Sequence, residues 1–356
     1  MAYSLKKMWT AMAVTLLAST SFVGAHYDNN MYDGNCCPPS CCDNNNCCGD
    51  FWVEADALWF KADEDGLNYG SRITTTAIPG STTHDIRTRS VDPKWEAGFR
   101  IGVGYNLPCD CWDIAVYWTR FHHKNSRHHH FTPSTTDSFA PAFGPVAGDF
   151  AVAISNARAH WKLHVDLLDV ELGRDFCCSP CFTLRPFIGV RAAWIKQDFR
   201  PHYFFTDATG VETSLSDVRL KSDFDGAGIR GGLDSEWKFG CGFSIYGCAA
   251  ANVLYGEQRT HFDSTSSLLT GTAIEHQRHN YKRCMAITDA AIGLRYKTCF
   301  WCDSMAVTFQ LGYEHHYFWN KNRFENSITF TGDADQSFNR GDLCLHGVTF
   351  GARVDF

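Results

Sequence analysis

The sequence predicts an all-β protein: a transmembrane antiparallel up-and-down β-barrel of about 10 strands, with 12 possible. Three observations predict it: a two-residue alternation of apolar and polar side chains, alternating short and long connections, and a C-terminal aromatic strand. Within residues 341–356, successive side chains point to opposite faces. The apolar face holds Val348, Phe350, Ala352, Val354 and Phe356, and the other holds Thr349, Gly351, Arg353 and Asp355. Because this pattern recurs along the chain, it favours a membrane barrel.

The first residues predict export and cleavage. Lys6 and Lys7, the apolar run 8–17 and the small residues 23–25 are typical of a secretory signal peptide. We therefore expect a signal peptide (1–25), a cysteine-rich periplasmic leader (26–49) and an outer-membrane β-barrel (50–356). No later apolar run reaches the ~20 residues of a membrane helix. The net charge of −7 gives no indication of nucleic-acid binding.

Ten segments show the strand alternation. The expected strands are 50–61, 94–106, 111–121, 159–176, 182–198, 224–239, 242–257, 283–297, 304–317 and the C-terminal strand. The apolar phase slips at Leu167 and Leu168, which suggests a β-bulge. A further strand pair inside the longest links would raise the count to 12.

Short and long connections alternate along the chain. The turns NLPCDC, CCSPC, FGCG and TCFWCD are brief, whereas long polar links lie near 62–93, 122–158, 199–223, 258–282 and 318–340. Outer-membrane barrels have short periplasmic turns and longer extracellular loops. A soluble β-sandwich is the alternative, but its turns need not sort by side.

Aromatic rings near the expected strand ends are typical of the girdles that membrane barrels place at both interfaces. These rings are Trp59, Trp95, Trp112, Trp161, Trp194, Trp237 and Trp319. Packing in a core is the alternative for each ring taken singly.

All 17 cysteines follow the expected cleavage site, and this density in an exported chain indicates an oxidising compartment. The disulfide candidates lie in the leader or beside the short turns: Cys36, Cys37, Cys41, Cys42, Cys47, Cys48, Cys109, Cys111, Cys177, Cys178, Cys181, Cys241, Cys299 and Cys302. Adjacent cysteines bridge each other poorly, which favours distant or intermolecular partners. Zinc binding in the leader and a redox role for the last pair are weaker alternatives, because neither has the expected context.

Charged residues of both signs fall on the face opposite the apolar one. The candidate pore-lining residues are Glu54, Asp56, Glu96, Arg100, Asp113, Arg185, Arg191, Arg230, Asp234, Glu236, Asp289, Arg295, Glu314 and Arg353, and Asp169, Glu171 and Asp355 share that face. They would line a polar passage, or they would form a salt-bridged filling, because a barrel with few strands is narrow. The sequence leaves both interpretations open.

Two clusters in the expected loops could bind ligands. The histidines of HHKNSRHHH (122–130) could hold zinc or copper, although a solvated loop is commoner. The basic segment from Arg259 to Arg283 could contact acidic lipopolysaccharide sugars, although unspecific surface charge is commoner. No catalytic residue, metal or cofactor is predicted, because no hydrolase or phosphate-binding motif is present.

Four motifs carry a resemblance to a known family: CCPPSCCDNNNCC, DFWVEADALWFKADEDGLNYG, WEAGFRIGVGY and GVTFGARVDF. Through them, essentially the whole mature chain resembles the pore-forming major outer membrane proteins of the Legionella type and their counterparts in chlamydia-like bacteria. The resemblance implies a porin-like pore, abundance in the outer membrane and a disulfide-linked envelope.

Taken together, we expect a non-enzymatic pore in the bacterial outer membrane for passive diffusion of small hydrophilic solutes, with a cross-linked structural role. The expected partners are outer-membrane lipid, such solutes, and further copies of the chain or other cysteine-rich envelope proteins linked by disulfides. Nucleic acid is not an expected partner. The alternative is a closed barrel that acts as a structural protein or an adhesin through its external loops.

Overall fold

The computed structural model describes residues 50–79, 81–108, 111–130, 134, 137–143, 154–206, 211–268, 271–300, 305–330 and 333–356. Its strands are β1 (Asp50–Glu64), β2 (Asn68–Ile78), β3 (Ser81–Ser90), β4 (Trp95–Asn106), β5 (Trp112–His130), β6 (Asp137–Pro141), β7 (Ile154–Arg174), β8 (Phe176–Ser179), β9 (Phe182–Thr206), β10 (Glu212–Gly240), β11 (Phe243–Leu268), β12 (Gly271–Phe300), β13 (Met305–Phe330) and β14 (Asp333–Asp355). The expected signal peptide and leader lie outside the described residues.

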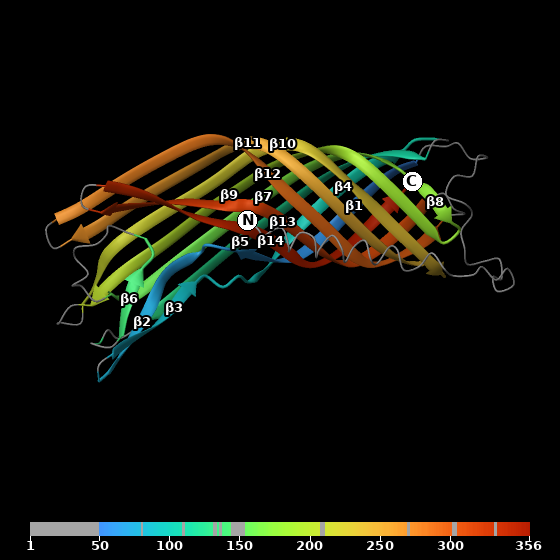
Figure 1. Ribbon diagram of the computed structural model, residues 1–356. Helices are drawn as coiled ribbons and strands as arrows, with labels where there is room; N and C mark the ends of the chain where they lie inside the picture. The colour runs from blue at the N-terminus through green and yellow to red at the C-terminus, as the bar shows by residue number, and fades with distance from the viewer. Residues whose placement is uncertain are drawn as a thin grey trace.

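The strands form a closed antiparallel barrel (Figure 1). Ten of the strands in the 11-stranded sheet follow the order β10-β11-β12-β13-β14-β1-β4-β5-β7-β9, and pairing of β10 with β9 closes the ring. The first and last strands pair from Trp52 opposite Asp355 to Glu64 opposite Leu343. Short β8 pairs only with the start of β9. The predicted barrel of about 10 strands is therefore confirmed.

The two longest links contain strands that do not enter the barrel. β2 and β3, from the link after β1, pair with each other, and β2 also pairs with β6, from the link after β5. This separate three-stranded sheet projects from the end of the barrel away from the C-terminus (Figure 1). Within the described residues, the barrel itself gains no further strand pair.

The four cysteine-bearing turns lie at one end, because each joins two paired strands at the end where Asp50 and Phe356 lie. The β10–β11 turn is the tightest. Both its central residues have positive φ, 53° at Cys241 and 80° at Gly242, as a type I′ hairpin turn requires. The sorting of turns by side, which the sequence predicted, is confirmed.

The long polar links, by contrast, were largely misread as loops. β5 continues to His130, β9 to Thr206 and β11 to Leu268, while β12 already begins at Gly271. Most of the expected loop residues are strands that extend the barrel beyond its apolar band. They read as loops because their outward side chains are polar.

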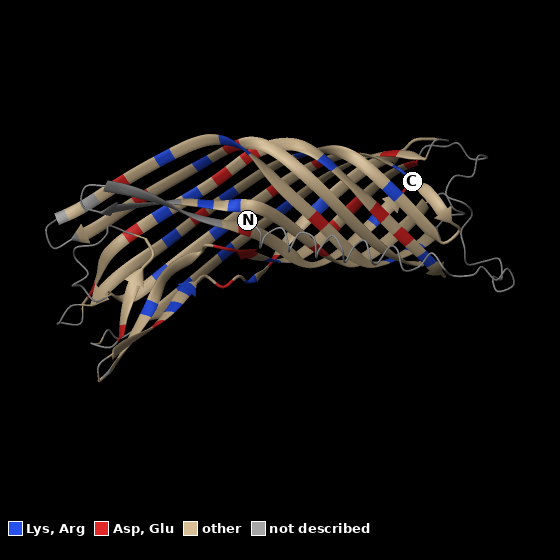
Figure 2. Ribbon diagram, viewed as in Figure 1, with Lys and Arg blue, Asp and Glu red and all other residues tan. Residues whose placement is uncertain are grey.

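The outward faces of the strands change character at one level. On β9 the outward side chains are apolar from Ile188 through Val190 to Trp194, and then charged at Lys196, Asp198 and Arg200. The other barrel strands show the same change where they pass that level. Charged residues therefore occur along the whole barrel in Figure 2, but they face the lumen in the apolar band and also face outward beyond it. Charged side chains are unfavourable on a lipid-facing surface, so only the apolar band can face lipid. We call this band the lipid belt, and we call the part of the barrel beyond it, where outward side chains are charged, the extension.

The inward faces change in the opposite direction at the same level. On β9, inward Arg191 is followed by Ile195 and Phe199, all three buried. On β7, Leu167 points inward and Leu168 outward, and the pairing with both neighbouring strands is unbroken. The predicted bulge there is therefore wrong. The apolar residues move from the outward to the inward positions of β7 because the side chains that fill the lumen change from charged to apolar at this level.

The aromatic girdle is largely as expected, with one exception. Trp59, Trp95, Trp194 and Trp237 point outward and are exposed. Trp161 instead points into the barrel and is fully buried. It lies on β7 beyond the level where the apolar residues switch to the inner face, and the position of that switch is not apparent from the residue pattern.

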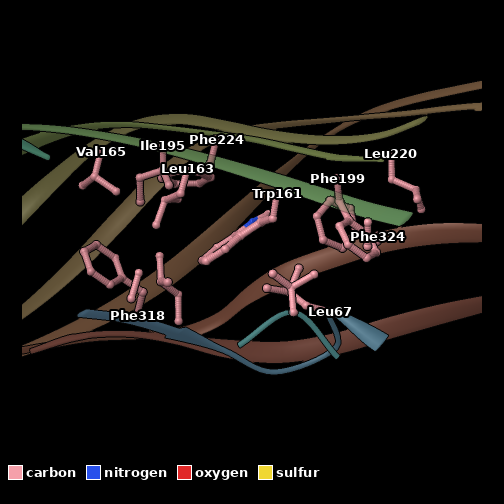
Figure 3. Close-up of a cluster of buried hydrophobic side chains, with 14 of the residues drawn as sticks. Leu67, Trp161, Leu163, Val165, Ile195, Phe199, Leu220, Phe224, Phe318 and Phe324 are labelled. Atoms are coloured by element: carbon pink, nitrogen blue, oxygen red, sulfur yellow. The ribbon is translucent and has the colours of Figure 1, made fainter. Parts of the chain in front are cut away.

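An apolar core fills the lumen of the extension (Figure 3). Trp161 lies near its centre, among side chains such as Leu163, Phe224 and Phe318 that come from different strands. The two longest links cap this core. From the link after β5, the Phe139 ring lies 6.5 Å from that of Tyr203, and in the link after β1 the Tyr69 carbonyl accepts a 2.5 Å hydrogen bond from the Tyr203 hydroxyl. The described residues contain no helix that is long and apolar enough to cross a membrane.

The burial of Trp161 predicts a large stability loss when its side chain is removed. Trp161→Ala should lower the free energy of unfolding by about 3–5 kcal/mol, because it leaves a cavity in a packed core. His160→Ala, on the adjacent outward position, should change it by less than about 0.5 kcal/mol. Urea unfolding of the refolded protein in phosphatidylcholine vesicles measures both values; equal effects of the two substitutions would contradict this packing.

Candidate functional site

A layer of charged side chains crosses the lumen at the level of the lipid belt. All the candidate pore-lining residues named from the sequence lie on the inner face, because each shares the two-residue phase of a buried inward neighbour. Most of them contact one another. Glu96, opposite Phe60 on β1, is set apart from the ion pairs described below.

Arg191 joins three strands. From β9 it donates two parallel hydrogen bonds to Asp169 on β7, of 2.5 and 2.7 Å, and a third of 2.8 Å to Asp289 on β12. Paired donation of this kind is the strongest common ion-pair geometry. Since β9 and β12 are separated by two strands around the ring, these bonds reach across part of the lumen.

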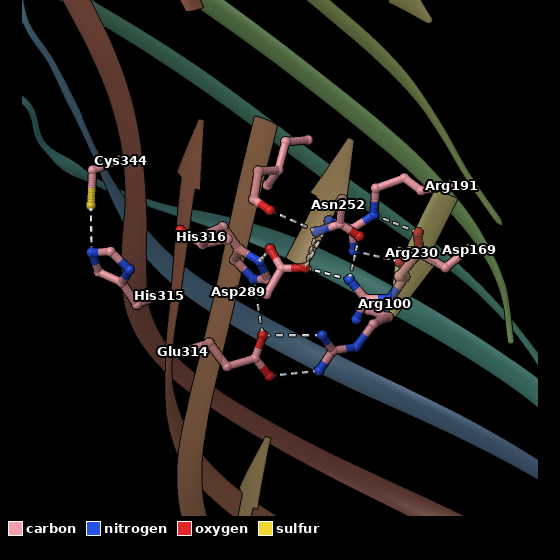
Figure 4. Close-up of polar contacts among 12 residues, drawn as sticks. Arg100, Asp169, Arg191, Arg230, Asn252, Asp289, Glu314, His315, His316 and Cys344 are labelled. Atoms are coloured by element: carbon pink, nitrogen blue, oxygen red, sulfur yellow. Dashed lines mark hydrogen bonds and ion pairs between the residues drawn. The ribbon is translucent and has the colours of Figure 1, made fainter. Parts of the chain in front are cut away.

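Arg230 on β10 reinforces the same centre. Its guanidinium donates to Glu171 at 2.7 Å, to the amide oxygen of Asn252 at 3.0 Å, and to Asp289. Asn252 also donates to Asp289 at 3.1 Å. The Asp289 carboxylate is thus the shared acceptor of several donors in a buried site (Figure 4).

His316 links this centre to the opposite wall. Its two ring nitrogens lie 2.9 Å from Asp289 and 3.2 Å from Glu314. Carboxylates accept hydrogen bonds when ionised, so contact with both favours the doubly protonated ring. Arg100 on β4 then donates to Glu314 at 2.6 and 3.0 Å and to Asp56 on β1 at 2.7 Å. A continuous chain of contacts therefore runs from β7 to β1.

The charged side chains of the layer are more exposed to solvent toward the cysteine-bearing turns. There Arg185 donates to Asp113 and Asp234, each at 2.7 Å. The Arg353 guanidinium lies 4.1 Å from the centre of the Trp52 ring. Side-chain exposure is 32% at Asp234 and 30% at Arg353, compared with 3% at Arg191. The charged side chains at the turn end are therefore accessible to solvent, whereas those at the centre of the layer are buried.

Three members of the layer were missed from the sequence. Asn252, Gln310 and His316 share the inward phase, but an uncharged or imidazole side chain did not stand out among the expected charges. Gln310 donates to Glu54 and Asp56 at 2.7 and 2.8 Å. Gln310 and His316 are an even number of residues from Glu314 on β13, so the strand period places both on the same face as Glu314.

One glycine is required by the close packing of this layer. A Cβ added at Gly351 on β14 would overlap the Asp56 carboxylate and would lie 2.9 Å from the amide nitrogen of Gln310. Any larger residue would therefore displace the acceptor that Arg100 uses.

The histidine run does not form a metal site. It lies on β5 rather than in a loop, so alternation sends His122 outward and His123 inward. Buried His123 packs against Trp161, with ring centres 5.0 Å apart, and burial together with the charge of Lys94 lowers its pKa to about 4. Among the described residues, no group of three or more histidine, cysteine or acidic side chains could hold a metal ion.

The cysteines of the turn end are only partly described. Cys111 and Cys177 are disulfide-bonded, and exposed Cys178 is a free thiol. Cys181 and Cys241 lie in the described turns as well, and for Cys299 the structure gives the backbone in β12. The remaining candidates, Cys36, Cys37, Cys41, Cys42, Cys47, Cys48, Cys109 and Cys302, lie outside the described residues.

The family of the chain is decided by a sequence model that matches residues 46–356, described as the Legionella pneumophila major outer membrane protein precursor. The chain belongs to the Legionella major outer membrane protein family. It is thus an outer-membrane β-barrel whose lipid belt contacts membrane lipid. Barrels of this membrane have short periplasmic turns and longer extracellular loops, and on this rule we propose that the cysteine-bearing turns face the periplasm and the extension faces the outside.

Solved outer-membrane barrels are similar to this family member only in general form. The outer membrane protease OmpT from Escherichia coli has a TM-score of 0.45 at 10% identity, covering 88% of this chain and 99% of the protease. A FadL homologue from Pseudomonas aeruginosa has a TM-score of 0.28 at 7% identity, covering 86% and 90% of the two chains. No curated protein matches the chain.

Removing the ion pairs of Arg191 should lower the stability of the barrel. Arg191→Gln leaves Asp169 and part of Asp289 unpaired in a buried site, so it should lower the free energy of unfolding by about 3–5 kcal/mol. Arg191→Leu combined with Asp169→Leu should cost less than the single change, because it removes both charges of the pair. Urea unfolding of Arg191→Gln, of the double variant and of the single variants Arg191→Leu and Asp169→Leu tests this. If the double variant loses the sum of the losses of the two single leucine variants, the ion pair is not the cause.

The ion pairs of Asp198 should make the stability of the extension depend on pH in acid. Partial burial raises its pKa, but hydrogen bonds from Arg200 at 2.7 Å and Arg219 at 2.8 Å outweigh this and lower the pKa to about 2. A lowered carboxyl pKa stabilises the fold above the unfolded-state pKa, and this stabilisation is lost as the pH falls toward the folded-state value. The difference in unfolding free energy between the parent and Asp198→Asn should thus be constant near neutrality and shrink between about pH 4 and pH 2. A difference that does not depend on pH would refute the assignment.

Proposed function

We propose that the protein is a gated outer-membrane pore for small hydrophilic solutes, with the charged layer as its selective part and the apolar core of the extension as its gate. The observation that carries the proposal is the order of the two layers along the lumen. A water-accessible charged vestibule opens to the periplasm, and a dry constriction follows it. Hydrophobic constrictions in channels close by excluding water.

The charged layer favours a transport role over simple filling. Burying ion pairs contributes little to stability, because the loss of hydration offsets their attraction, and apolar replacements are often neutral or stabilising. The extension of the same barrel shows that this chain can fill a lumen with apolar side chains. A polar lumen restricted to the lipid belt, as in pores, therefore supports a function that needs charge there.

The gate consists of side chains and link segments, with no helix among the described residues placed in the lumen. Trp161 and its neighbours close the bore, and the ends of the two longest links cover them. Opening would require the cap to lift and the central rings to change rotamer. Passage would then be passive and without a chemical step, so we propose no enzymatic activity.

A closed structural barrel is the second candidate. It is favoured by the chain of ion pairs that ties β7, β9, β12, β13, β4 and β1 together across the lumen. In either case we propose that cysteines of the periplasmic end join the protein to other copies or to other cysteine-rich envelope proteins. Their position at one rim, in an oxidising compartment, supports such links.

Planar-bilayer recording separates the two candidates. A gated pore should give stepwise currents with a low open probability, and Trp161→Ala should raise that probability because it removes the central ring of the constriction. Trp194→Ala, which removes a ring of the same size from the outer surface, should leave the currents unchanged. If the parent and Trp161→Ala proteins are both folded and inserted but silent, the pore is refuted and the closed barrel stands.

A further inference from the structure

A patch of positive charge lies on the outer wall of the extension, directly above the lipid belt. Its outward side chains come from three neighbouring strands: Arg120, His122 and Lys124 on β5, Lys162 and His164 on β7, and Lys196 on β9. Trp118 and Trp194, both exposed, end the lipid belt just below it. We call these six residues the basic patch.

The cross-strand pairing in this patch sets two lysines directly opposite each other, beside a cluster of imidazoles whose pKa is lowered by burial and by the nearby cations. Lys124 is opposite Lys162, His122 is opposite His164, and His164 is opposite Lys196. The rings of His122 and His164 have centres 4.3 Å apart. Because like charges directly opposite each other destabilise a sheet, the arrangement does not serve the stability of the barrel alone.

The patch also lacks internal neutralisation. Among the described residues no carboxylate lies within ion-pair distance of Lys124, Lys162 or Lys196, and only Arg120 approaches one, Asp166 at 3.6 Å. Asp198, opposite Lys162, is held instead by Arg200 and Arg219, at 2.7 and 2.8 Å.

Two basic side chains of β11 and β12 are, by contrast, held by carboxylates. Arg259 pairs with Asp225, and His276 lies 2.8 Å from Asp263. Both belong to the basic segment that the sequence offered as a lipopolysaccharide contact. The charge of that segment is thus partly neutralised, whereas the three lysines of the basic patch on β5, β7 and β9 have no carboxylate partner in the part of the chain that the structure describes.

We propose that the basic patch binds the phosphate groups of the glycolipid that forms the outer leaflet of the membrane. The patch lies on the extracellular side of the belt, at the depth where acyl chains meet headgroups. Lysine and arginine at such a boundary attract anionic headgroups. The Trp118 and Trp194 rings below would contact the adjoining acyl chains. This inference does not depend on whether the barrel conducts.

The test uses the folded full chain in detergent and diphosphoryl lipid A as the probe, with binding measured by native mass spectrometry. The variant Lys124→Gln/Lys162→Gln/Lys196→Gln removes the unpaired charges. The control Lys221→Gln/Arg278→Gln/Lys282→Gln makes the same charge change on outward positions of β10 and β12. Fully dephosphorylated lipid A and inorganic phosphate form two further arms.

The patch variant should bind diphosphoryl lipid A at least about tenfold more weakly than the parent, whereas the control should stay within about twofold. The parent should bind dephosphorylated lipid A as weakly as the patch variant does, and inorganic phosphate should not compete. Without lipid A, the patch variant should be as heat-stable as the parent or more so, because a repulsion is removed. Equal binding by the two triple variants, equal binding of both lipid A forms, or full competition by inorganic phosphate would overturn the proposal.

Discussion

The structure depends on one constraint: at the upper edge of the lipid belt, every strand that passes this level must exchange the polarity of its two faces. Below this edge the outward side chains meet lipid, so the charges of the strand can only point into the lumen. Above it the outward side chains meet water, and the apolar residues turn inward to form a packed core as in a soluble protein. Because strand geometry fixes the two-residue period, the exchange needs no change of backbone, and β7 passes through it with its pairing intact.

This exchange explains why two very different fillings share one lumen. The buried carboxylates of the charged layer need donors from several strands, and Asp289 obtains them from Arg191, Arg230 and His316. Each such contact fixes the distance between strands far apart in sequence. The apolar core above needs only shape complementarity, and Trp161 provides much of its volume. The charged layer and the apolar core therefore keep the barrel closed by different physical means, and only the former offers a path on which a solute could be selected.

Sequence alone predicted the barrel, its strand count and the side of its turns, because all three follow from the period of two and from connection lengths. It placed Arg191, Arg230 and Glu314 on the inner face for the same reason. It misread the extension, since strands with charged outward faces and apolar inward faces resemble polar loops when no boundary is known. The errors at Trp161 and at the supposed bulge near Leu168 have this one cause. The partners within the lumen, such as His316 between Asp289 and Glu314, depend on which strands lie across the bore, and a linear pattern does not contain that information.

The exchange of faces is tested most directly by the environments of two outward positions on β9, one on each side of Trp194. A spin-labelled amino acid would be introduced by codon suppression at Val190 and, separately, at Lys196 in the protein inserted into phosphatidylcholine vesicles. Relaxation by oxygen, which concentrates in lipid, and by a water-soluble nickel complex would then be compared. We predict that oxygen dominates at 190 and nickel at 196. If both labels respond mainly to oxygen, the lipid belt continues past Trp194 and the account of the two layers is wrong.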